Sequence, residues 1–217
     1  NRINDKMIAN DIRDLQPWYD GGFKVMEVKD KAGKDLRTTI NQTMMRIDLP
    51  FTLKPGELFS FKIKWWYNIN DRIRLGGRSG YEYFEQDKNY LYTMAQFYPR
   101  MAAYMDYCGW QNKQFLGAGE FTLDFGNYEV NITVPEDHVV AATGELQNAK
   151  NVLTQEQMNR FEKAKKSYDA PVLIITQEEA EANEKTPASQ EKTWTFKANN
   201  VRDFAFASSR KFIWDAM

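Results

Sequence analysis

The sequence predicts a mainly β protein, a twisted antiparallel β-sandwich with one short helix. Three observations lead to this fold class. Aromatic residues make up 14% of the chain, and aromatic side chains suit the half-buried surface of a pleated sheet. Apolar and polar residues alternate with period two, most clearly over residues 59–66. Helical periodicity is clearest in one stretch, which follows Thr154.

The first predicted strands lie in the amino-terminal third of the chain. A strand over residues 23–28 turns around Gly33 into a return strand over 37–47, which reads as a hairpin. Residues 54–57 form a tight turn, because proline presets φ and glycine accepts a positive φ. The alternation over 59–66 then indicates a strand with one buried face.

The central strand of the prediction carries Gln96. A segment over 81–84 turns through 86–89 into this strand. The strand ends at Pro99, because proline has no N–H to donate to a neighbouring strand. Alternation puts Gln96 on a mostly apolar face, and Arg100 follows as a fixed cation.

The second half of the chain continues the β pattern and adds the helix. We predict a hairpin about Gly126-Asn127, and Thr154 with Gln157 fits a capping box that starts the helix. The predicted hairpin joins 120–125 to 128–134, the other predicted strands cover 139–143, 171–176, 192–197 and 203–207, and residues 178–184 form a polar turn or short helix.

Composition excludes several classes of protein. The formal net charge of -1 gives no basic face for nucleic acid, and no apolar run reaches the roughly 18 residues of a membrane span. The single cysteine, Cys108, rules out an internal disulfide framework. The chain lacks an initiating Met and stops at Met217 within an apolar segment, so we expect a piece of a longer protein. The sequence does not indicate the cellular compartment. For the longer protein, the periplasm or the cell envelope is the compartment that we consider.

Catalytic motifs are not found in this sequence. A zinc hydrolase needs about three protein ligands, but His138 is the only histidine, and we expect it to be a surface residue that opens a strand. Ser208-Ser209 is not part of a nucleophile-elbow motif or of a recognisable catalytic triad, and Cys108 lacks an obvious histidine partner. Carboxylate pairs for glycoside hydrolysis are expected by chance among thirty acids: Glu82 with Glu85, and Asp106 with Glu120.

Several stretches together resemble a known family. They are residues 96–100, 119–125, 128–135, 140–144 and 200–207. They resemble the amino-terminal domain of the zinc aminopeptidases typified by aminopeptidase N and leukotriene hydrolase, and the likeness is greatest to large bacterial members. The resemblance implies a saddle-like β-sandwich domain over 1–200, and a linker or strand over 201–217 that leads into a catalytic domain.

The resemblance also implies a role for three residues. Gln96 would project toward the catalytic cleft and hold the free α-amino group of a peptide, and Tyr98 and Arg100 would line the same rim. A carboxamide oxygen accepts from an ammonium without adding net charge. The family's acidic companion to this glutamine has no clear counterpart, since Phe97 and Tyr98 follow it, which leaves the substrate preference open. Each residue also has a structural alternative. Gln96 could satisfy a neighbouring backbone group, Tyr98 could pack in the core, and Arg100 could form an ion pair.

Zinc, the general base and the peptide-anchoring loop are implied to lie beyond Met217. This chain would then hold no catalytic residue, no metal and no cofactor. Its partners would be its own catalytic domain and peptide substrates.

The alternative function is a stand-alone β-sandwich that binds carbohydrate or protein. Trp65, Trp66, Tyr67 and Trp110 could provide an aromatic platform for sugar rings. Strand alternation puts Trp65 and Trp66 on opposite faces, so these two cannot stack on one ligand together.

Overall fold

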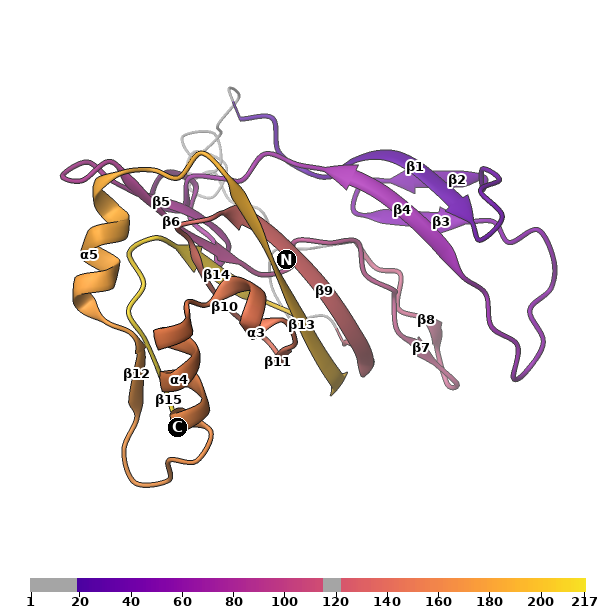
Figure 1. Ribbon diagram of the computed structural model, residues 1–217. Helices are drawn as coiled ribbons and strands as arrows, with labels where there is room; N and C mark the ends of the chain where they lie inside the picture. The colour runs from indigo at the N-terminus through magenta and orange to yellow at the C-terminus, as the bar shows by residue number, and fades with distance from the viewer. Residues whose placement is uncertain (1–18, 115–121) are drawn as a thin grey trace. The chain divides into compact units, whose positions relative to one another are not determined.

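The computed structural model describes residues 19–114 and 122–217 (Figure 1). It is mainly β, and all pairs of named strands in these ranges are antiparallel, which confirms the predicted fold class. The prediction of a single helix is wrong, because four short helices lie in the described ranges. The chain divides into two compact units. Unit 1 comprises the described residues of Asn1–Ile69 and Arg100–Leu123, and unit 2 comprises Asn70–Pro99 and Asp124–Met217.

Unit 1 contains three two-stranded sheets. They are β1 (Lys24–Asp30) with β4 (Phe61–Trp66), β2 (Thr38–Asn41) with β3 (Met44–Ile47), and β7 (Tyr104–Met105) with β8 (Gly109–Trp110). The predicted pairing of the first strand with its return strand is therefore wrong. After the turn at Gly33 only Lys29 and Asp35 form a bridge, and the return segment folds back on itself around Gln42, whose φ is 51°.

Few apolar side chains of unit 1 are buried. Among its described residues these are Val28, Leu36 and Ala103. Many larger ones are exposed, and Leu58 reaches 94%. Others that are at least half exposed are Met26, Ile40, Phe51, Met101, Tyr104, Tyr107 and Trp110. Unit 1 therefore has little hydrophobic core of its own.

Unit 2 contains two larger sheets that share one core (Figure 1). The first has the strand order β10 (Val139–Ala142), β14 (Phe206–Ser209), β6 (Asn89–Met94), β5 (Gly80–Phe84). The second has the order β11 (Glu145–Leu146), β13 (Glu191–Val201), β9 (Gly126–Pro135). Trp194 and Phe196 from β13 pack in one cluster with Val140 from β10, so the two sheets form a sandwich.

The chain crosses from one sheet to the other at Gly144. Just before it, the backbone N–H of Thr143 donates to the carbonyl oxygen of Ala205 at 3.0 Å. Gly144 has a φ of 90°, and a Cβ at this position would lie 2.3 Å from the carbonyl oxygen of Lys197 in β13. Only glycine fits this approach, because any side chain would meet backbone atoms.

Several predictions for the strands of unit 2 differ from the structure. The hairpin about Gly126-Asn127 is wrong, because residues 122–125 are not a strand and β9 pairs with β13; residues 120 and 121 lie outside the described ranges. The last predicted strand starts later, at Phe206, and the final strand β15 (Trp214–Ala216), paired with β12 (Val172–Ile175), was missed. The expected boundary at residue 200 lies within β13, and the residues after it supply β14 and β15.

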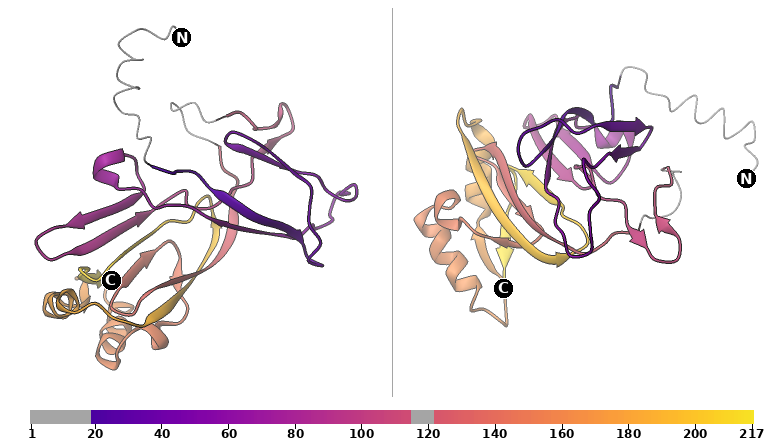
Figure 2. Two further views of the ribbon diagram at one scale, coloured as in Figure 1. Left: turned by 90° about the horizontal axis from the view of Figure 1, so that it is seen from above. Right: turned by 90° about the vertical axis from the view of Figure 1, so that its right-hand side faces the viewer.

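Three of the four described helices of unit 2, those after residue 148, lie together on one side of its sheets, whereas the single turn that precedes β5 lies apart from them (Figure 2). The predicted helix is α4 (Gln155–Ala164), and its capping box is confirmed: Thr154 Oγ1 accepts from Gln157 N, and Gln157 Oε1 accepts from Thr154 N. A second capping box starts α5 (Gln177–Lys185), and α2 (Arg72–Leu75) and α3 (Ala149–Val152) are single turns. None of the helices in the described ranges is long and apolar enough to cross a membrane.

Candidate functional site

Gln96 lies beyond the end of β6 rather than within it. The strand stops at Met94 because Ser79 intervenes: its hydroxyl donates to Thr93 O and accepts from Ala95 N, both at 3.1 Å. Gln96 then takes a φ of 53°, a left-handed conformation that is uncommon outside glycine. Its side chain is exposed, so the expectation of a position on the apolar face of the strand is wrong.

Tyr98 anchors the segment that presents Gln96. Its hydroxyl donates to Asp203 Oδ1 at 2.9 Å, and the same oxygen accepts from Phe204 N at 2.7 Å. The ring of Phe97 meets the rings of Tyr98 and Phe206 edge-on, with centroids 5.0 and 5.1 Å apart. Gln96 is thus followed by two residues that are fixed against the segment before and within β14.

Arg100 is half-buried and belongs to unit 1, at the start of its second stretch. Gln96 and Tyr98 belong to unit 2. The structure therefore brings Gln96 and Tyr98 together on one short segment, and the role of Arg100 at the same rim stays a prediction.

His138 is buried, so its assignment to the surface was wrong. It is 4% exposed, and its Nδ1 lies 2.9 Å from the hydroxyl oxygen of Ser208, which is 2% exposed. No pattern in the sequence indicates this pair, because β10 and β14 become neighbours only in the sheet. A histidine at this distance can act as the general base that activates a serine nucleophile. Here both side chains are too buried for a substrate to reach.

His138 does not fit a zinc site. Its Nδ1 is occupied by Ser208, and no group of three or more His, Cys, Asp or Glu side chains suited to a metal ion occurs in residues 19–114 and 122–217. The neighbouring ion pair of Asp137 and Arg210 is partly buried, with Arg210 Nη2 3.4 Å from Asp137 Oδ2. No step of metal chemistry is assigned to these residues.

Burial lowers the pKa of His138 below its ordinary value near 6.5. The carboxylate of Asp137 raises this pKa, whereas the positive charges of Arg210 and Lys192 lower it further. Because Ser208 Oγ can donate to a neutral imidazole, the folded state holds His138 uncharged in neutral solution.

Acidification should therefore destabilise unit 2. The unfolded chain takes up a proton on His138 below about pH 6.5, whereas the folded chain takes it up only below the lowered pKa. Stability should fall by up to about 1.4 kcal/mol per pH unit across that interval. Urea unfolding between pH 5 and 8 should show this slope in the wild type and a flatter profile in His138→Gln. An equal slope in both proteins would contradict the assignment, because the sequence has only one histidine.

Four tyrosines form one face of the β5–β6 hairpin. Tyr81 and Tyr83 of β5 lie opposite Tyr92 and Tyr90 of β6. The ring centroids of Tyr83 and Tyr90 are 4.8 Å apart, and Tyr90 and Tyr92 are stacked at 6.0 Å. Tyr83 and Tyr90 are 42% and 41% exposed, and no hydrogen bond joins any of the four hydroxyls to residues that the structure describes. We call this surface the tyrosine face.

Other predicted candidates are separated or already paired. In β4 the side chain of Trp66 is exposed and that of Trp65 is half-buried, which confirms that they alternate. Glu82 forms an ion pair with Arg72, with 2.7 Å between Glu82 Oε1 and Arg72 Nη2. Cys108 Sγ accepts a hydrogen bond from Gln111 Nε2 at 2.8 Å. In the pair of Asp106 with Glu120, residue 120 lies outside the described ranges.

Comparison with known proteins adds no family assignment: no family model, no curated protein and no solved structure matches this chain.

Proposed function

We propose that this chain is the amino-terminal, non-catalytic domain of a zinc-dependent aminopeptidase-like protein. In this proposal it braces the catalytic domain and contributes a wall of the cleft that binds the peptide amino terminus. Zinc and the hydrolytic water belong to the catalytic domain. The observation that carries the proposal is the exposed carboxamide of Gln96, presented on a backbone that its neighbours hold in place.

The conformation of Gln96 supports a recognition role. A left-handed φ on a non-glycine residue costs about 1 kcal/mol or more, and it persists where the surroundings fix the backbone. Here Ser79 fixes the residue before Gln96, and Phe97 and Tyr98 pack immediately after it. The amide itself forms no hydrogen bond to the described residues, so its oxygen is available to an ammonium group.

The order of elements also supports the proposal. The family pattern runs from a strand with its glutamine, through a segment that contains arginine and proline, to a pair of strands that ends in Val-Pro and then a short buried strand. This chain follows the order except that β9 has no strand directly before it in the described residues to pair with. In this chain β6 precedes Gln96, β9 ends at Pro135, and β10 follows with Val139 and Val140 buried.

The exposed apolar side chains of unit 1 are what a bracing domain would require. Soluble proteins rarely leave large apolar surfaces without a function or a partner. Leu58, Met101 and Tyr107 each expose well over half of their surface. A catalytic domain that covers such side chains would account for their type and number.

The recognition role predicts a specific kinetic defect. In the longer protein that the proposal implies, Gln96→Ala and Gln96→Glu should alter kcat/KM for amino acid chromogenic substrates measured with added zinc. Losing one hydrogen bond to a charged group is worth about 1.5 to 3 kcal/mol, so Gln96→Ala should lower kcat/KM by about 10- to 100-fold. The catalytic zinc site should be unaffected.

Lys88 provides the matched control. It is exposed, lies in the same unit and has a φ of 56°, so Lys88→Ala imposes the same backbone cost without removing the Gln96 amide. Lys88→Ala should leave kcat/KM unchanged. An active protein that is indifferent to both Gln96 substitutions would reduce this chain to a brace, and inactivity of the wild type with zinc present would contradict the proposal.

A binding module is the second candidate, and the tyrosine face favours it. Tyrosine rings stack on apolar faces of a ligand while their hydroxyls donate and accept hydrogen bonds, which suits sugar rings. The isolated chain separates the candidates. A binding module should retain affinity for oligosaccharides that Tyr83→Ala and Tyr90→Ala abolish, whereas a cleft wall should bind none.

A further inference from the structure

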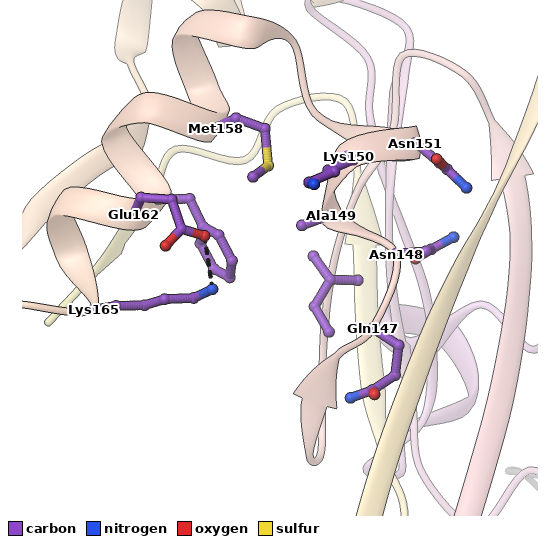
Figure 3. A pocket seen from close by; sticks show the side chains of 10 residues that line it. Gln147, Asn148, Ala149, Lys150, Asn151, Met158, Glu162 and Lys165 are labelled. Carbon is purple, nitrogen blue, oxygen red and sulfur yellow. Dashed lines mark hydrogen bonds and ion pairs between the residues drawn. The ribbon is translucent and has the colours of Figure 1, made fainter.

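An open groove lies in unit 2 between α4 and the segment that joins β11 to α3 (Figure 3). Its volume is about 460 Å³, which is within the range of small-ligand sites. Met158, Phe161 and Glu162 of α4 line it, together with Lys165, the residue that caps the end of this helix. The opposite wall is formed by residues 146–151.

The floor of the groove is apolar and is held by the core. Leu146, Met158 and Phe161 are each half-buried and pack against the core cluster, and Ala149 is buried within it. The ring of Phe161 also contacts Trp214, with centroids 5.6 Å apart. These side chains are fixed before any ligand arrives, so an apolar group can be covered at little ordering cost.

The rim of the groove is cationic. Lys150 and Lys165 stand on opposite walls, and Figure 3 shows both side chains extending toward the space between them. Lys165 donates to Glu162 at 2.8 Å and lies 4.5 Å from the centre of the Phe161 ring. Lys150 is exposed and forms no ion pair with the described residues. Two lysines against one glutamate leave the lining with a net positive charge.

The pKa of Glu162 shows that the rim stabilises a carboxylate in its charged form. The hydrogen bond from Lys165 lowers the pKa of Glu162, and the charges of Lys165, Lys166 and Lys150 add to this effect. The lysines around the groove therefore favour a negative oxygen in this place, and one glutamate does not neutralise them.

We infer that this groove binds a small carboxylate that carries an apolar side group, independently of the function proposed above. The apolar group lies over Met158 and Phe161, and the carboxylate is held between Lys150 and Lys165. Exposed ion pairs contribute little and are screened by salt, so the binding is weak and salt-sensitive.

The test uses N-acetyl-L-phenylalanine as the probe and its uncharged amide as the matched ligand. The full chain carries ¹³C in its methionine methyl groups, and Met158→Leu identifies the Met158 signal. The acid should shift this signal saturably, with a dissociation constant in the millimolar range. Replacing the acid by the amide, or making Lys150→Gln or Lys165→Gln, should weaken binding by up to about fivefold.

Lys163 supplies the control substitution. It is exposed on the same helix but does not line the groove, so Lys163→Gln changes the net charge equally and should leave binding unchanged. The inference is overturned by a Met158 signal that does not saturate, by an amide that binds as well as the acid, or by equal effects of Lys163→Gln and Lys150→Gln.

Discussion

Replacing Trp194 by alanine should lower the free energy of unfolding of unit 2 by about 3 to 5 kcal/mol, the usual cost of removing a buried tryptophan. Trp194 is fully buried in β13 and contacts Phe196 and Trp214, with centroids 6.4 and 6.5 Å apart. It belongs to the cluster that both sheets of unit 2 share. Because domains are stable by only about 5 to 15 kcal/mol, this loss should move the urea midpoint far down.

Trp194→Phe is the control for this substitution. It keeps most of the apolar volume, and it removes an indole N–H that has no hydrogen-bond partner in the described structure. The phenylalanine variant should therefore be much less destabilised than the alanine variant. Trp110→Ala, at an exposed site of unit 1, should change stability little. Equal effects of the two Trp194 variants would contradict the assigned packing.

Gly144→Ala should be the second most damaging single change. The positive φ strains any side chain by about 1 to 3 kcal/mol, and displacing neighbours costs a further 1 to 3 kcal/mol. A Cβ would stand 2.3 Å from Lys197 O and 2.8 Å from Ala198 Cβ. Backbone of β13 must shift to accept it, so the loss should appear in unit 2 as a lower urea midpoint.

Gly77 separates strain from collision. Its φ of 98° is close to that of Gly144, it lies in the same unit, and a Cβ there would meet nothing within 4 Å. Gly77→Ala should therefore show the cost of the dihedral angle alone. If Gly77→Ala and Gly144→Ala cost the same, then the contact with β13 is not the reason that glycine is required.

Local sequence signals predicted where helices and strands lie along the chain better than they predicted which strands pair with each other. The capping box at Thr154 depends on four consecutive residues, and α4 begins where it predicts. Pairing often depends on chain segments that are far apart, and the hairpins predicted for residues 23–47 and 120–134 failed for this reason, whereas residues 81–84 do pair with the strand that follows their turn. Residues 24–30 pair with residues 61–66, and β9 pairs with β13, and in both cases the partner is far from the strand along the chain.

The candidate sites show the same limit. Alternation placed Gln96 within a strand, but Ser79 ends that strand two residues earlier through a side-chain hydrogen bond that no periodicity reveals. His138 looked like a surface residue beside a turn, whereas it is covered once Ser208 is brought next to it. The tyrosine face needed the register of β5 and β6, since its members alternate along both strands.

The place of β14 in its sheet has a consequence for how the protein is made. β14 lies between β6 and β10, and the side chain of Ser209 donates to the carbonyl oxygen of Tyr90, 119 residues earlier. During synthesis, β6 and β10 leave the ribosome without the strand that joins them. At typical translation rates this gap lasts on the order of ten seconds. A nascent chain that is released before Ser209 therefore exposes two unpaired strand edges, which makes premature termination a route to aggregation.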